Sequence, residues 1–204
     1  MISIIDYGVG NVLAFANVYH RLDIPAAIAS SPEQIENASK LILPGVGAFD
    51  HAMGRLNASG MRPKLDELVR ERGVPILGVC VGMQMLAASS EEGDLSGLDW
   101  VGGEVRKLDA CALDQGTRLP HMGWNDVTPV CESPLFSGLE RDARFYFLHS
   151  YYFQGAHSED ILAETDYGIT FSCAVQSGNI YGVQFHPEKS HRFGTELLKN
   201  FAEL

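Results

Sequence analysis

Residues 75–86 read PILGVCVGMQML, and this short stretch decides the fold that we expect for the chain. Its apolar beginning, residues 75–79, is typical of a buried strand, and residues 83–86 have a helical pattern. Cys80 stands between them, with a glycine two positions away on either side. A strand that turns sharply into a helix at such a segment is typical of a nucleophile elbow, here with cysteine in place of serine.

Apolar strand candidates alternate with helical patterns through the first half of the chain. This alternation predicts βαβ units, which build a parallel sheet with helices on both faces. Ligands of such open sheets bind beyond the carboxyl ends of the strands. The expected strands are residues 2–5, 26–29, 40–43 and 75–79, and the expected helices are residues 12–22 and 62–72.

The second half places strand candidates one after another, some of them separated by turn residues as hairpins require. No linker or charge block divides the chain, so we expect one domain over residues 1–204. The expected class is α/β, with an open, mostly parallel sheet, flanking helices and an antiparallel, strand-rich second half. The later strands are expected at residues 101–106, 125–130, 144–148, 151–154, 161–164, 171–176 and 180–184, followed by a helix at residues 191–202.

Composition excludes several classes of partner and site. The formal net charge of −11 repels phosphate backbones, so we do not expect nucleic acid as a partner. No apolar run approaches the roughly 20 residues that cross a bilayer, and the N-terminus lacks the features of a signal peptide. The four cysteines form no Cys-x-x-Cys pair, which leaves no zinc or redox motif. We therefore expect a cytoplasmic protein without a cofactor.

The elbow interpretation gives Cys80 a chemical role. A sulfur at a helix N-terminus gains thiolate character from the helix dipole, and the backbone N–H of Val81 points to where an oxyanion would form. The alternative is a buried structural cysteine on a tight turn, since cysteine is among the most often buried residue types. The two flanking glycines favour the nucleophile.

His186-Pro187-Glu188 is the candidate for a base and its orienting group. Residues two apart in an extended segment point to the same side, and Pro187 biases His186 toward extended geometry. A carboxylate beside an imidazole is the arrangement that cysteine nucleophiles use. The alternatives are a turn with a hydrogen-bonded histidine and a solvated glutamate, and a metal site of His186 with His191, for which no further close ligand is present.

A second loop, Gly45-Val46-Gly47, follows the strand at residues 40–43. Glycines there free the peptide planes, so that an N–H can turn toward a bound carbonyl. The alternative is a plain turn. Gly8-Val9-Gly10 superficially suggests a dinucleotide fingerprint, which we reject because position 13 is leucine rather than glycine.

Together these motifs are similar to those of the triad class, class I, of glutamine amidotransferases. GVCVGMQ at residues 78–84 resembles the family's nucleophile motif, and QFHPE at residues 184–188 resembles its His/Glu motif. PGVGAF at 44–49, PHMGWN at 120–125 and DYGVGN at 6–11 resemble the branch that serves imidazole glycerol phosphate synthases in histidine biosynthesis. The resemblance implies a flavodoxin-like three-layer fold and a glutaminase that passes ammonia to a separate (β/α)₈ cyclase or synthase subunit in a heterodimer.

The resemblance also implies roles for particular residues. Cys80 would be the nucleophile, His186 the base and acid, and Glu188 the group that orients His186. Val81 would donate its N–H to the oxyanion, with a peptide of Gly45, Val46 or Gly47 as second donor. The positions that would hold the substrate L-glutamine are Gln84, Glu92, Ser150 and Tyr151, and those that would face the partner subunit are Trp124, Tyr146 and Lys189.

Other features leave alternatives open. Residues 109–118 look like a lengthened loop, and several non-catalytic stretches resemble paralogues that are linked to surface polysaccharide genes. The same chemistry would there supply ammonia for amidination of a sugar. A stand-alone γ-glutamyl hydrolase or cysteine peptidase could also use Cys80 and His186, although Glu188 argues against it. A non-enzymatic regulator should lack one member of the triad, and none is missing.

Overall fold

The central feature is a sheet of eight strands, seen in a computed structural model that describes residues 1–109 and 118–204. Its first five strands are parallel, and its last three run antiparallel to their neighbours. This arrangement confirms the expected α/β class. In order across the sheet the strands are β2 (Ala26–Ala29), β1 (Ile2–Ile5), β3 (Lys40–Gly45), β4 (Ile76–Cys80), β13 (Ile180–Val183), β12 (Thr170–Ser177), β11 (Ile161–Asp166) and β8 (Thr128–Pro129).

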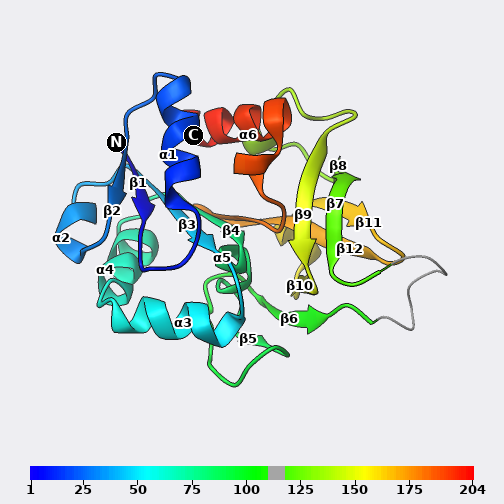
Figure 1. Cartoon of the computed structure of the whole chain (residues 1–204), viewed down its shortest axis with the longest axis horizontal. Helices are drawn as coiled ribbons and strands as arrows, with labels where there is room; N and C mark the ends of the chain where they lie inside the picture. Colours follow the sequence, from blue (N-terminus) through cyan, green and yellow to red (C-terminus); the bar gives the residue numbers. More distant parts are fainter. Residues whose placement is uncertain (110–117) are drawn as a thin grey trace.

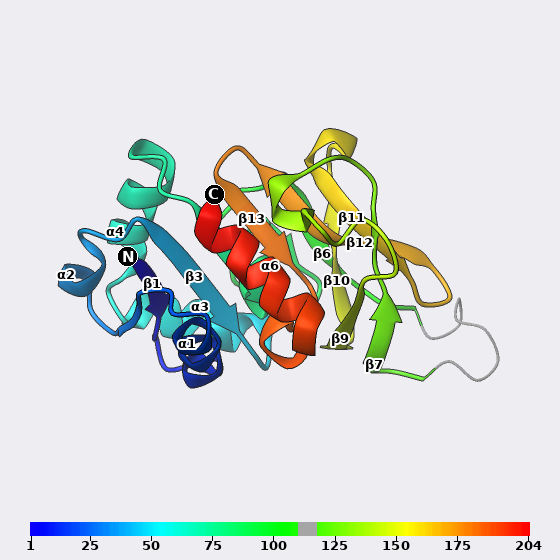
Figure 2. The same cartoon turned by 90° about the horizontal axis from the view of Figure 1, so that it is seen from above.

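Helices cover both faces of the parallel half (Figure 1). α1 (Val12–Arg21) and α6 (His191–Glu203) lie on one face, and Figure 2 shows α6 over the sheet, roughly in line with β3 and β13 on either side of it. α3 (Phe49–Ala58) and α4 (Arg62–Asp66) lie on the other face. Shorter helical segments are α2 (Pro32–Ile35), α5 (Val81–Gln84), the π-helical continuation Glu67–Glu71, and the 3₁₀ turns Pro134–Phe136, Ser158–Asp160 and Pro187–Lys189.

Two small sheets form a further layer beside the antiparallel half (Figure 2). One has the order β10-β6-β5, and the other pairs β7 with β9. The bounds of these strands are Ser89–Ser90 for β5, Gly103–Lys107 for β6, His121–Asp126 for β7, Arg144–His149 for β9 and Tyr151–Gly155 for β10.

The core follows from the parallel strands, which are covered on both faces and therefore carry continuous apolar runs. Ile4, Leu41 and Ile42 are fully buried, as are most of their neighbours in the sheet. Tyr19 of α1 is also fully buried, and its hydroxyl donates a hydrogen bond to the backbone oxygen of Leu198 in α6 at 3.1 Å. The two helices on this face are thus tied to one another as well as to the sheet.

The structure corrects several expectations from the sequence. Helices α2 and α3 were not predicted, although α3 carries a buried apolar face at helical spacing, made of Phe49, Ala52, Met53 and Leu56. The strand expected at residues 125–130 is two strands, of which β7 begins earlier, at His121. The lengthened loop expected at residues 109–118, with Cys111, lies almost entirely outside the described residues. Among the described residues, no helix is long and apolar enough to span a bilayer.

Candidate functional site

Cys80 ends strand β4 in a strained backbone conformation, with φ of 56° and ψ of −113°. Positive φ is uncommon for a residue with a side chain and persists only where the surroundings fix it. Close packing of the turn does so here. A Cβ on Gly82 would lie 1.9 Å from the backbone oxygen of Leu43, and one on Gly78 would lie 2.6 Å from that of Gly82. Both glycines of the elbow are therefore required by backbone contact, as the sequence pattern indicated.

The helix that follows Cys80 is too short to have a large dipole. α5 has four residues, Val81 to Gln84, so its macrodipole is small. Its first N–H groups still lack partners within the helix, and that of Val81 is next to the sulfur. The helix dipole that we expected to activate Cys80 is thus a weak effect, and the neighbouring side chains must supply most of the stabilisation of a thiolate.

His186 lies between Cys80 and Glu188. Its Nδ1 donates a hydrogen bond to Oε1 of Glu188 at 2.9 Å, and the two side chains are only 4% and 2% exposed. On its other side His186 shares the wall of one cavity with Cys80, and the interaction with Cys80 is among the causes that shift the pKa of His186. Burial lowers the pKa of His186, but the interactions with Cys80 and Glu188 raise it by more. The resulting pKa of His186 is about 9. An imidazolium at neutral pH favours a thiolate beside it.

Ser190 holds the backbone of His186 in place. Its hydroxyl donates to the backbone oxygen of His186 at 2.6 Å and accepts from the backbone N–H of Tyr146 at 2.9 Å. The N–H of His186 in turn donates to the backbone oxygen of Tyr146 at 2.8 Å. Ser190 belongs to no recognisable motif, because its hydroxyl forms its hydrogen bonds with backbone atoms, and the sequence did not predict it.

The sulfur and the imidazole line a cavity of about 300 Å³, which is the size of a small-molecule site. Its wall also contains Pro120, Leu148 and His149, to which the sequence analysis gave no role. Glu188 lies behind His186, while Gly45, Trp124 and Tyr146 are not part of the wall. The expected site residues that do line it are Val46, Gly47, Cys80, Val81, Gln84, Glu92, Ser150, Tyr151, His186 and Lys189.

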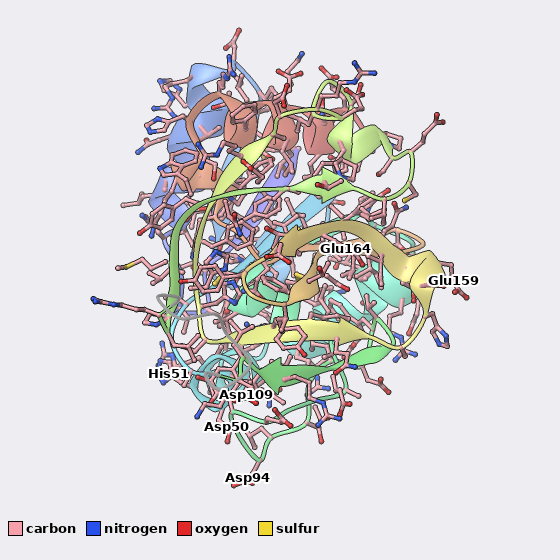
Figure 3. All side chains as sticks on the ribbon, turned by 90° about the vertical axis from the view of Figure 1, so that its right-hand side faces the viewer. Asp50, His51, Asp94, Asp109, Glu159 and Glu164 are labelled. Atoms are coloured by element: carbon pink, nitrogen blue, oxygen red, sulfur yellow. The ribbon has the colours of Figure 1, made fainter. Side chains whose placement is uncertain are left out.

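Glu92 is tied to the N-terminus of α3. Its Oε2 accepts a hydrogen bond from the backbone N–H of Phe49 at 2.8 Å. Asp50 completes this connection by accepting from the backbone N–H groups of Asp94 and Leu95 at 3.0 Å each. Figure 3 shows Asp50 and Asp94 close together at one edge of the molecule. The segment that carries Glu92 is thereby fixed next to the loop that precedes α3.

Trp124, Tyr146 and Lys189 form an exposed cluster near the cavity. The rings of Trp124 and Tyr146 are 6.4 Å apart, and Nζ of Lys189 lies 5.9 Å from the Tyr146 ring. His191 stacks on Trp124 at 5.3 Å instead of joining His186, and the described part of the chain holds no group of three metal-binding side chains. Met122 is 63% exposed beside this cluster, so the face has the apolar character of an interaction surface.

Two buried histidines pair beside the cavity: His149 is part of its wall, and His121 lies next to His149. Nδ1 of His149 donates to the backbone oxygen of Tyr151 at 2.8 Å, so its Nε2 must accept from Nδ1 of His121, which is 2.9 Å away. Burial lowers the pKa of His121 to about 4. Burial, the charge of His121 and that of His186 lower the pKa of His149 to about 3, against a partial rise from its bond to Tyr151. Both rings are therefore neutral at physiological pH.

The neutral histidines make stability depend on pH. The folded-state pKa of His149 lies below its unfolded value of 6.5. The contribution of the neutral ring to the unfolding free energy is therefore complete above pH ~6.5 and is lost as the pH falls toward 3. When the pH is lowered from 7 to 5, the unfolding free energy should therefore fall by about 2 kcal/mol less in His149→Gln than in the wild type. Urea titrations at the two pH values measure this difference. His20→Gln, on an exposed position, is the control. Equal losses in the wild type and His149→Gln would contradict this account.

The sequence matches a known family over nearly its whole length. Residues 3–204 match the family described as glutamine amidotransferase class-I. The chain is 60% identical to imidazole glycerol phosphate synthase subunit HisH of Bdellovibrio bacteriovorus, and 49% identical to the subunit of the same name of Leptospira interrogans. Both alignments span 204 residues and cover 100% of each chain.

Solved structures with lower sequence identity share the fold. One, a crystal structure of a glutamine amidotransferase, has a TM-score of 0.72 at 20% identity and covers 97% of this chain and 98% of that one. Another, of PurLQS from Thermotoga maritima, has a TM-score of 0.71 at 17% identity and covers 99% of this chain and 97% of that one. At these identities the likeness concerns the fold alone.

Proposed function

Because this chain belongs to the class I glutamine amidotransferase family, we propose that it is the glutaminase subunit of an imidazole glycerol phosphate synthase in histidine biosynthesis. It hydrolyses L-glutamine to glutamate and delivers the ammonia to a partner synthase subunit. The observation that carries this proposal is that Cys80 and His186 line one cavity while Glu188 binds His186 from behind. The full-length identity of 60% to a subunit with that name favours this product over an amidinated sugar.

The reaction begins at the sulfur. The Cys80 thiolate attacks the side-chain carbonyl carbon of glutamine, and the carbonyl oxygen becomes an oxyanion. The N–H of Val81 and a peptide N–H of Gly45, Val46 or Gly47 stabilise that oxyanion. Removing one such donor costs about 10²–10³ in rate in a protease.

His186 then moves the protons. Its imidazolium protonates the amide nitrogen as the C–N bond breaks, which releases ammonia and leaves a γ-glutamyl thioester on Cys80. The neutral imidazole next takes a proton from water, which hydrolyses the thioester to glutamate and restores the thiolate. Glu188 keeps Nδ1 protonated throughout, so that Nε2 faces the reacting groups.

The substrate is held by its amino-acid end. Glu92, Ser150 and Tyr151 line the cavity, and in this proposal Glu92 binds the α-ammonium group and the backbone at Ser150 and Tyr151 binds the α-carboxylate. Gln84 lines the same cavity, but its Nε2 already donates to the backbone oxygen of Tyr151 at 2.9 Å and to Oε1 of Gln184 at 3.1 Å. It therefore contributes to substrate binding chiefly as an acceptor through Oε1.

The ammonia requires a partner that shields it. In bulk water at neutral pH ammonia becomes ammonium, which is not a nucleophile. The exposed cluster of Trp124, Tyr146 and Lys189 lies beside the cavity and is the surface where a (β/α)₈ cyclase would dock. Docking there would enclose the mouth of the cavity and give the ammonia a sheltered route.

The test is glutamate release by the purified chain alone and after addition of the cyclase subunit from the same organism. Glutamate release should rise at least about tenfold on addition of the cyclase, and the gene should rescue a histidine auxotroph that lacks this subunit. Full turnover without any partner would instead favour a stand-alone γ-glutamyl hydrolase. Turnover without rescue would favour the sugar-amidating branch.

A further inference from the structure

Gln184 lies beside the nucleophile but takes no part in the bond-making and bond-breaking steps of the proposed reaction. It follows β13, whose residue Val183 pairs with Val79 of β4, so the chain delivers it next to Cys80. Its side chain is completely buried, and its Nε2 lies 3.8 Å from the sulfur of Cys80. The backbone N–H of Gln184 is fixed by a hydrogen bond to the backbone oxygen of Cys173 at 2.8 Å. The amide group is thus held at the sulfur by the fold.

The direction of this amide is set by a backbone carbonyl. The oxygen of Tyr151 can only accept, and it receives hydrogen bonds from Nδ1 of His149 at 2.8 Å and Nε2 of Gln84 at 2.9 Å. Gln84 must therefore present its nitrogen, which also donates to Oε1 of Gln184 at 3.1 Å. With its oxygen occupied in this way, Gln184 presents an N–H to Cys80.

The opposite orientation would be costly. It would place Oε1 of Gln184 against the sulfur and two N–H groups against one another, in a region where Gln84 is only 2% exposed. The backbone oxygen of Leu148 lies 3.9 Å from the same sulfur, so a second acceptor there, from a reversed Gln184 amide, would add to the repulsion of a thiolate. That oxygen can accept from a thiol but repels a thiolate, whereas an N–H from Gln184 favours the thiolate.

We propose that Gln184 is a positioning residue for the nucleophile, donating its amide N–H to the Cys80 sulfur and stabilising the thiolate. The chain of hydrogen bonds from the Tyr151 oxygen through Gln84 keeps that N–H directed at the sulfur. This inference rests on the proposed role of Cys80, but it makes a claim about the thiol that can be measured without glutamine or partner.

The test is the pH dependence of carbamidomethylation of Cys80 by iodoacetamide, followed on the Cys80 peptide by mass spectrometry. Gln184→Glu keeps the size of the side chain and places a carboxylate at the sulfur. Because a hydrogen bond to a charged group contributes about tenfold to a hundredfold in an equilibrium constant, the rate at pH 7 should fall by at least about tenfold. The rate at high pH, where the thiol is fully ionised, should stay near that of the wild type.

Two further variants separate this role from a structural one. Gln84→Glu should shift the same profile in the same direction, because a carboxylate cannot donate to the Tyr151 oxygen, and it serves as the test if Gln184→Glu does not fold. Gln176→Glu, on a half-exposed glutamine of β12 that bonds to Gly178 and Tyr181, is the matched control and should leave the profile unchanged. Folded Gln184→Glu or Gln84→Glu proteins with a wild-type profile would overturn the proposal. If the variants shift the profile but the wild type hydrolyses no glutamine, the positioning role of Gln184 stands and the proposed glutaminase function is refuted.

Discussion

Cys80→Ala is expected to reduce glutamate release from glutamine by at least about 10⁴-fold, measured with the cyclase partner present. The variant loses the atom that forms the thioester, and no other described side chain of the cavity wall is a thiol. Knocking out the nucleophile of a hydrolase that works by the same covalent route costs about 10⁶-fold. The substitution removes one buried atom, so the fold should remain.

A second cysteine provides the control for this experiment. Cys131 is exposed, and its sulfur lies 3.6 Å from the backbone oxygen of Ile161, on a different part of the molecule. Cys131→Ala should keep glutamate release within about twofold of the wild type. Turnover retained by Cys80→Ala at any partner concentration would remove Cys80 from the mechanism.

Glu188→Gln is expected to lower kcat by about 10²–10⁴-fold. The analogous change in a serine protease leaves the geometry intact and costs about 10⁴-fold, because the imidazole is held in the wrong tautomer. Here it also removes a charge that, together with the Glu188 hydrogen bond and the neighbouring Cys80, raises the pKa of His186. The pKa of His186 should fall, so the alkaline limb of the kcat/KM profile should move to lower pH.

The control for Glu188→Gln is the same substitution at an exposed site. Glu196 of α6 pairs with Lys199 at 3.5 Å on the surface, and Glu196→Gln should change neither the rate nor the pH profile. Thermal unfolding should show that both variants fold. If Glu188→Gln kept the wild-type rate, Glu188 would be a structural residue without a part in the chemistry.

The parallel half of the fold was predictable from the sequence, and the elbow in particular. β1 and β2 have the bounds expected from their apolar runs, and β3 and β4 differ by one or two residues. The runs are clear because both faces of these strands are buried. The two glycines around Cys80 are required by contacts within one turn, which is why a local pattern could reveal them.

The pairing of β13 with β4 was not predictable from local pattern. About a hundred residues separate Cys80 from His186 along the chain, and the strands from β5 to β12 lie between β4 and β13 in the sequence. Apolar periodicity gives the elements and not their order in a sheet. Only the resemblance to class I glutamine amidotransferases predicted that the motifs at residues 78–84 and 184–188 belong to one site.

Strand β7 shows why part of the site was missed. Its polar residue His121 is buried, while its large apolar residues Met122 and Trp124 face outward. This reverses the usual pattern of a surface strand, because one side faces the polar network behind the cavity and the other carries the exposed cluster. Gln184 and Ser190 were missed for a related reason, since each acts through one or two hydrogen bonds that no spacing in the sequence reveals.

The most direct test of the central claim is labelling with 6-diazo-5-oxo-L-norleucine, a glutamine-shaped electrophile that alkylates a thiolate able to attack the substrate carbonyl. We predict a single label per chain, located on Cys80 by peptide mass spectrometry, with glutamate release lost in proportion to labelling and with protection by glutamine. Complete loss of activity with Cys80 unlabelled, or full activity after Cys80 has been labelled, would contradict the account.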